Sequence, residues 1–166
     1  LVDKNSSPEG AGVLSTEPPN RPFSWLAAED TIVIFIHGFL GSPDVFRLPA
    51  LQLHQRGYAS AALLLPGHGG DGRAFTNASE WDWIAHVRAE IDRLRDGYPR
   101  VFLVGHSLGG LLALDYAAEH TKNPVTGIVL MGTPLRLRFH VNVIRNALKL
   151  YLTPPADDDP VTAAYR

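Results

Sequence analysis

The stretch Gly105-His106-Ser107-Leu108-Gly109 decides the fold of this chain. It follows the short apolar run 101–104 and precedes the small, apolar run 111–114. A Gly-x-Ser-x-Gly pentapeptide between a strand and a helix is the signature of a nucleophile elbow, where glycines permit a sharp turn and leave space around the serine. We therefore expect Ser107 to lie at the end of a strand with its hydroxyl exposed and the N-terminus of a helix behind it.

The composition is that of an ordinary globular domain. The chain has 166 residues, 45% of them hydrophobic and 19% charged, which suffices for one domain with a substantial core. The net charge of −2 gives no reason to expect a nucleic-acid partner, and the absence of cysteine excludes disulfides, a thiol nucleophile and thiolate metal sites. Residues 1–20 lack the apolar centre of a signal peptide, so a cytoplasmic location is the default expectation.

Strand and helix patterns alternate along the chain. Residues 1–20, rich in Ser, Pro, Gly and Glu, are predicted to be a flexible arm, and residues 21–134 to be part of an α/β core. The alternation predicts a mostly parallel sheet with helices on both faces. The predicted strands are 23–26, 31–36, 58–65, 101–104 and 125–131. The predicted helices are 48–56, a helix of four to five turns capped by Ser79, and 107–120.

The helix after Ser79 has a regular apolar stripe. Apolar residues recur there at helical spacing, and we expect all of them to be buried against the sheet. They are Trp81, Ile84, Val87, Ile91 and Leu94. The loops that follow the predicted strands begin at His37, Pro66, Gly105 and Gly132, and they should converge on one side of the sheet, where such folds bind ligands.

Four motifs in this order resemble the α/β-hydrolase superfamily, and most closely its monoacylglycerol lipase and small carboxylesterase branch. The resemblance covers about residues 31–134, and the tryptophan-rich helix before the elbow also fits that branch. Aminopeptidase-like and lactonase-like members share several of these loops. The motifs are Ile36-His37-Gly38-Phe39, Pro66-Gly67-His68-Gly69, Gly105-His106-Ser107-Leu108-Gly109-Gly110 and Gly132-Thr133-Pro134.

The resemblance implies a Ser-Asp-His triad in that chain order, with Ser107 as the nucleophile that forms an acyl-enzyme. The backbone N–H groups of Leu108 and Phe39 are expected to form the oxyanion hole, the second on the strength of the resemblance. The triad Asp and His are expected beyond Arg166. We therefore expect this chain to be the N-terminal part of a hydrolase of about 250 residues, truncated before the last strands and inactive without its missing C-terminal part.

The histidines near these motifs are not expected to act as the base. The resemblance implies that His37 braces its own loop, and we expect His68 to brace the Gly-rich loop in which it lies. His106 adjoins Ser107, but adjacent residues at a sharp turn point apart. No pair of histidines has a metal-ligand context, and neither a metal nor a cofactor is expected. Solvated helix positions are expected for His54, His86 and His120.

Residues 135–166 are predicted to begin a cap or lid. The basic amphipathic stretch 136–152 is interpreted as a cap helix over an acyl pocket, with transient contact to a membrane surface as a compatible alternative. The acidic run 157–159 is interpreted as a solvated helix start rather than a cation site. Phe39 and Leu40, together with this cap, favour a small-molecule ester with an apolar acyl group.

Three functions therefore remain open. The leading hypothesis is a serine carboxylester hydrolase, similar to acylglycerol lipases and carboxylesterases. The second is an aminopeptidase or other amidase on the same scaffold. The third is a non-catalytic binding protein with an α/β-hydrolase-like fold, which has no need of the intact elbow or of the His-Gly-Phe loop.

Overall fold

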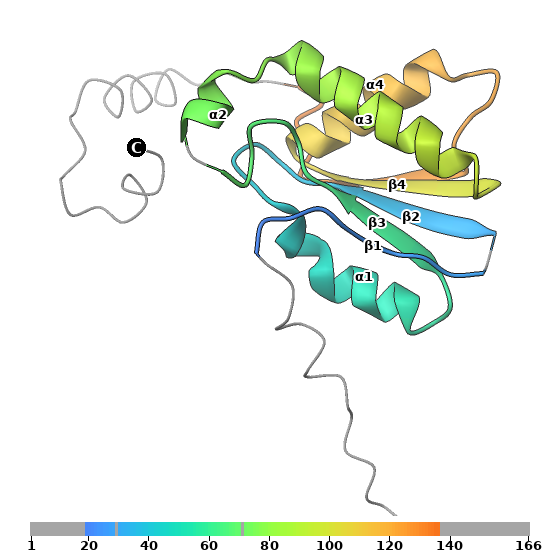
Figure 1. Ribbon diagram of the computed structural model, residues 1–166. Helices are drawn as coiled ribbons and strands as arrows, with labels where there is room; N and C mark the ends of the chain where they lie inside the picture. Colours follow the sequence, from blue (N-terminus) through green and yellow to red (C-terminus); the bar gives the residue numbers. More distant parts are fainter. Residues whose placement is uncertain (1–18, 29, 71, 137–166) are drawn as a thin grey trace, which may run out of the picture.

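The computed structural model describes residues 19–28, 30–70 and 72–136 of the chain. These residues form a five-stranded sheet in the order β1-β3-β2-β4-β5 (Figure 1). Strand β1 pairs antiparallel with β3, and the remaining pairs are parallel, which confirms the mostly parallel sheet. The strands are β1 (Phe23–Trp25), β2 (Thr31–Ile36), β3 (Ala59–Leu63), β4 (Arg100–His106) and β5 (Gly127–Met131).

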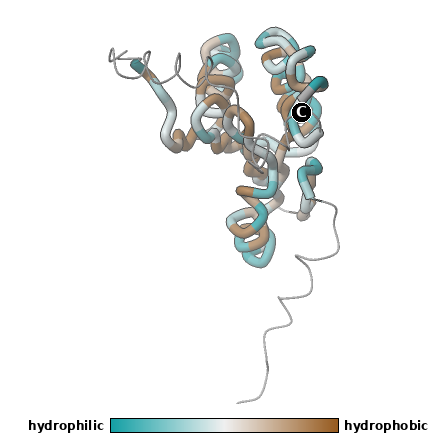
Figure 2. The backbone as a smooth tube through the Cα atoms, turned by 90° about the vertical axis from the view of Figure 1, so that its left-hand side faces the viewer, coloured by the Kyte–Doolittle hydropathy of each residue, from teal (hydrophilic) through white to brown (hydrophobic). Residues whose placement is uncertain are grey.

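Helices cover both faces of the sheet, as predicted. Helix α1 lies on one face, and α3 and α4 lie side by side on the other (Figure 1). Figure 2 shows hydrophobic and hydrophilic stretches alternating along the turns of the helices, as expected where one side of each helix is buried. The helices are α1 (Arg47–His54), preceded by the 3-10 turn Pro43–Phe46, α2 (Gly72–Thr76), α3 (Glu80–Arg95) and α4 (Leu108–Glu119).

Strand β2 lies at the centre of the core because both of its faces are covered. Ile34 and Ile36 belong to the larger hydrophobic cluster, which also contains the buried side of α3. Phe35 belongs to the smaller cluster, where its ring stacks on that of Phe46 with centroids 4.9 Å apart. A strand buried on both faces reads as an uninterrupted apolar run, which is why this strand could be recognised in the sequence.

Helix α3 begins at a capping box. The Ser79 hydroxyl accepts the Asp82 N–H at 3.3 Å, and the Asp82 carboxylate accepts the Ser79 N–H at 2.8 Å. The predicted stripe is wrong at Trp81, which is 71% exposed. Trp83 turns inward instead, because its indole N–H finds an acceptor in the Pro66 carbonyl at 2.9 Å.

The predicted end segments lie mostly outside the described residues. This holds for residues 1–18 of the arm, for 137–166 of the expected cap, and for the acidic run 157–159. Within the described part, β5 forms one edge of the sheet, and Val129 and Met131 on it are 51% and 46% exposed. No helix in that part is long and apolar enough for a membrane span.

The start of α4 lies directly against the end of β2. A Cβ built on Gly109 would stand 2.1 Å from the Ile36 carbonyl oxygen and 2.6 Å from that of His37. Both contacts are with backbone, which cannot move aside as a flexible side chain can. Position 109 therefore has room only for glycine, and this contact sets the distance between the elbow and the loop after β2.

We expect Gly109→Ala to lower the free energy of unfolding by about 3 kcal/mol or more, because the added methyl group forces two backbone segments apart. Urea denaturation measures the change. Gly97→Ala is the matched control, since a Cβ there meets its nearest atom at 3.9 Å. The control should stay within about 0.5 kcal/mol of the parent protein. Equal stability of both variants would contradict the close approach.

Candidate active site

Ser107 occupies a strained turn between β4 and α4. Its φ of 51° and ψ of −112° lie in a region that residues with side chains rarely adopt. The turn is held from two sides, because the Ser107 N–H donates to the Met131 carbonyl at 2.8 Å and the Ser107 carbonyl accepts the Gly110 N–H at 3.1 Å. The predicted elbow geometry is therefore present, with the serine half-buried at the end of its strand.

The Ser107 hydroxyl is not used as a structural cap. It does not cap α4, and it makes no hydrogen bond to any other residue in the described ranges. His106 is exposed, and its ring lies beside Gly38. Among the residues that the structure describes, no histidine or carboxylate is hydrogen-bonded to the serine.

The loop after β2 touches the elbow. A Cβ on Gly38 would stand 3.2 Å from the Ser107 Cβ and 2.9 Å from His106 Nδ1, so any larger residue there would push against both side chains. The Gly38 carbonyl accepts two hydrogen bonds, from the Gly41 N–H and from His37 Nδ1, both at 2.9 Å. In a trans peptide the N–H points opposite to the carbonyl. These two bonds therefore fix the direction of the Phe39 N–H.

The two expected oxyanion donors have no protein partner in the described part of the chain. The Phe39 N–H donates to none of these residues. Leu108 is the first residue of α4, where a backbone N–H has no acceptor within its own helix, and none is supplied from elsewhere in that part. Both amides therefore have no hydrogen-bond acceptor among the described residues.

His37 braces its loop, as the sequence analysis expected. It is completely buried, and its Nε2 accepts the Leu65 N–H from the loop after β3 at 3.1 Å. A nitrogen that accepts a hydrogen bond carries no proton, so the proton of the neutral ring lies on Nδ1, which donates to the Gly38 carbonyl. Both ring nitrogens are occupied, so His37 is not free to act as a base.

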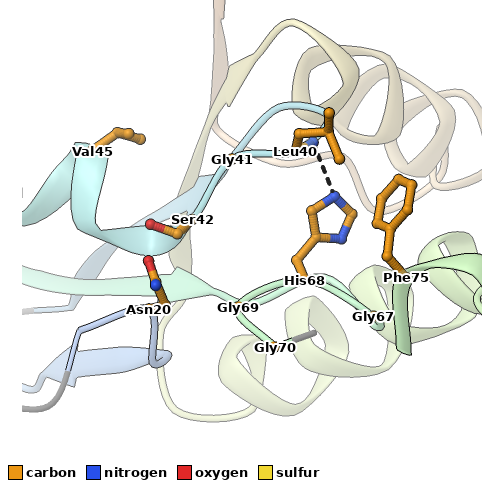
Figure 3. Close-up of a pocket in the computed structure, with 10 residues that line it drawn as sticks. All are labelled: Asn20, Leu40, Gly41, Ser42, Val45, Gly67, His68, Gly69, Gly70 and Phe75. Carbon is orange, nitrogen blue, oxygen red and sulfur yellow. Dashed lines mark hydrogen bonds between the residues drawn. The ribbon is translucent and has the colours of Figure 1, made fainter. Parts of the chain in front are cut away.

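His68 joins the same two loops from the other side, because it lies on the loop after β3 and binds the loop after β2. Its Nε2 accepts the Leu40 N–H at 3.3 Å, and its Nδ1 lies 3.2 Å from the Pro66 carbonyl (Figure 3). The expectation that His68 braces its own Gly-rich loop is confirmed, and the bond to Leu40 extends that role to the neighbouring loop. The rings of His37 and His68 meet edge to face, with centroids 4.9 Å apart.

Two aromatic rings pack against the Phe39 side chain. The Phe39 ring is 56% exposed and packs edge to face on Phe75 and Trp83, at centroid distances of 5.1 and 6.2 Å. The sequence analysis did not single out Phe75, because α2 is a five-residue helix and too short to show a periodic pattern. Its only signal was an aromatic residue close after the Gly-rich loop.

A cavity of about 420 Å³ lies between the loops after β2 and β3 (Figure 3). It contains Leu40 in its wall, but neither Ser107 nor Phe39, so this cavity is offset from Ser107. Its lining residues are Asn20, Leu40, Gly41, Ser42, Val45, Gly67, His68, Gly69, Gly70 and Phe75.

The other histidines lie away from this site. His54 is exposed, as expected, but His86 is half-buried, so the expected solvated position is wrong there. The expected solvated position is wrong for His120, whose ring stacks on Tyr116 with centroids 3.9 Å apart because it closes the last turn of α4. Within the described ranges no group of His, Asp or Glu side chains could hold a metal ion.

Comparisons with known proteins agree with the fold described above. A model of the "Alpha/beta hydrolase family" matches residues 33–166. Phospholipase YtpA of Bacillus subtilis is 31% identical over 112 residues, which are 67% of this chain and 43% of that protein. The thermostable monoacylglycerol lipase of Bacillus sp. (strain H-257) is 34% identical over 97 residues, or 58% of this chain and 38% of that lipase.

A solved structure reported for the metagenome-derived lipolytic enzymes LipS and LipT has a TM-score of 0.68 and 27% sequence identity. The match covers 84% of this chain and 54% of the chain in that structure. The matched part of this chain therefore spans less than half the length of the two curated relatives.

The burial of His37 makes the stability of the folded protein depend on pH. It lowers the pKa of His37 from 6.5 to about 4, because the imidazolium would lose its hydration; the bond to the Gly38 carbonyl opposes this effect, and His68 adds to it. The folded pKa lies below the unfolded one, so the unfolded chain takes up this proton first as the pH falls. The stability that neutral His37 contributes is fully present above pH 6.5 and is lost as the pH falls toward 4.

We expect His37 to contribute about 2.5 kcal/mol to the loss of stability between about pH 7 and pH 4.5. Urea denaturation of the parent protein and of His37→Gln at both pH values isolates this contribution, since the glutamine does not titrate. The parent protein should lose more stability than the variant. The same pH dependence in both proteins would contradict the burial of a neutral His37.

Proposed function

This chain belongs to the alpha/beta hydrolase family, and we propose that it acts as a serine carboxylester hydrolase through Ser107. One observation carries the proposal. The Ser107 hydroxyl stands at a strained turn without a hydrogen-bond partner among the described residues, and the Gly38 loop lies against it. Strain that neighbouring contacts maintain around a reactive group is typical of catalytic sites. The lipase and phospholipase names of the relatives favour an ester over other substrates.

In the proposed reaction Ser107 Oγ attacks the ester carbonyl carbon, and the hydroxyl proton passes to a base. The carbonyl oxygen becomes an oxyanion, which accepts hydrogen bonds from the Phe39 and Leu108 N–H groups. The C–O bond to the alcohol then breaks, the alcohol leaves with the proton, and an acyl-enzyme remains. Water hydrolyses the acyl-enzyme by the same route. We propose that the base and the acid that orients it come from outside the described residues.

The acyl group of the substrate is proposed to be apolar. Phe39 and Leu40 present side chains that are 56% and 47% exposed beside the elbow. Their exposure on the loop that provides an oxyanion donor favours contact with a hydrocarbon chain over contact with a charged group. The proposed substrates are therefore small-molecule esters of fatty or short-chain acids.

Ser107→Ala should lower kcat for a short p-nitrophenyl ester by about 10⁴-fold or more, because no acyl-enzyme can form. The measurement uses the natural protein that carries this chain. Ser24→Ala, an exposed serine on β1, is the control and should retain full activity. Equal activity of the parent protein and Ser107→Ala, including no activity in either, would contradict the proposal and favour a binding protein.

Substrate preference distinguishes the proposed ester hydrolase from an aminopeptidase or amidase on the same scaffold. We expect the protein to hydrolyse a short acyl ester and to leave an aminoacyl arylamide intact, because Phe39 and Leu40, exposed on the loop that touches the elbow, are apolar and offer no carboxylate to a free α-amino group. Parallel assays with p-nitrophenyl butyrate and leucine p-nitroanilide decide between the two. Faster turnover of the arylamide would contradict the ester assignment.

A further inference from the structure

Leu40 stands next to the proposed oxyanion donor in a conformation that needs support. Its φ of 54° lies in the left-handed region, which leucine rarely adopts. Such a residue stays there only where neighbouring contacts hold it. Two hydrogen bonds hold it here. The Gly41 N–H donates to the Gly38 carbonyl at 2.9 Å and closes the turn that contains Leu40, and the Leu40 N–H donates to His68 Nε2, which Figure 3 shows as a dashed line.

His68 is itself firmly held. It is 8% exposed, and its Nδ1 lies 3.2 Å from the Pro66 carbonyl, which also accepts the Trp83 indole N–H at 2.9 Å. The His68 ring packs edge to face on Phe75 and Trp83, with centroid distances of 5.0 and 5.7 Å. Because Nε2 accepts the Leu40 N–H, the ring is neutral with its proton on Nδ1. His68 therefore offers Leu40 a fixed acceptor.

The two histidines fix the peptides on either side of Phe39. The Gly38 carbonyl is bound by His37, and the Leu40 N–H is bound by His68. If Leu40 relaxed to a negative φ, the Phe39–Leu40 peptide would turn. That peptide shares the Phe39 Cα with the Gly38–Phe39 peptide, so the donor loop would lose its support on the C-terminal side of Phe39. The bond to His68 thus adds a second support to a loop whose first support is the pair of hydrogen bonds to the Gly38 carbonyl.

We propose that His68 is a positioning residue for the oxyanion hole, acting through the N–H of Leu40. The proposal rests on the proposed function, since it assumes that Phe39 provides an oxyanion donor to an intermediate on Ser107. His68 touches neither the serine nor the proposed substrate carbonyl. It affects the rate by holding the donor loop, so its loss should appear in kcat rather than in KM.

A matched pair of variants tests this role. In His68→Gln the amide oxygen can stand near the place of Nε2 and accept the Leu40 N–H. In His68→Asn the shorter side chain reaches only the place of Nδ1. We expect kcat for p-nitrophenyl butyrate to fall about tenfold to hundredfold in His68→Asn, with KM within about twofold, and to stay within about threefold of the parent in His68→Gln.

The experiment uses the natural protein that carries this chain, with melting temperatures measured for both variants and His54→Asn as an exposed control. An unchanged kcat in His68→Asn would overturn the assignment. So would an equal loss in both variants, a change confined to KM, or a failure of both to fold, because His68 would then be structural or substrate-binding. An inactive parent protein, or one unaffected by Ser107→Ala, would overturn the proposed function and this assignment with it.

Discussion

The site depends on close packing at two glycines. At Gly109 the first turn of α4 lies against the Ile36 carbonyl, and at Gly38 the loop after β2 lies against Ser107. These contacts bring the proposed nucleophile, the helix N-terminus and the proposed donor loop to one point at the carboxyl ends of β2 and β4. Parallel pairing of those strands keeps that point in register, because Ile36 lies beside Gly105.

Hydrogen bonds to two histidines then fix the orientation of these loops. His37 reaches from the loop after β2 to Leu65, and His68 reaches from the loop after β3 to Leu40. Each neutral ring accepts one N–H and has its other nitrogen beside a carbonyl of its own loop. Donors held in place before the reaction stabilise a developing charge without reorganising, which is the main electrostatic advantage of an enzyme over water. The buried neutral histidines provide that rigidity without placing a charge in the core.

The features that sequence predicted correctly are local ones. Ser79 is recognisable as a cap because it directly precedes an apolar pattern at helical spacing, and the elbow because its turn, strand and helix are contiguous. The Leu40–His68 bond joins residues 28 positions apart and leaves no pattern in the chain. The exposure of Trp81 and the burial of Trp83 also escaped prediction. Either tryptophan fits the inner face of the helix by spacing. Trp83 turns inward because its indole N–H reaches the Pro66 carbonyl, 17 positions earlier in the chain.

The central claim is that Ser107 is an activated nucleophile, and covalent labelling tests it most directly. The natural protein that carries this chain is treated with a fluorophosphonate probe, and the labelled peptide is identified by mass spectrometry. The account predicts a single phosphonate adduct on Ser107, formed within minutes at neutral pH and prevented by prior denaturation. A folded protein that shows no adduct, or one whose adduct lies on another residue, would contradict it.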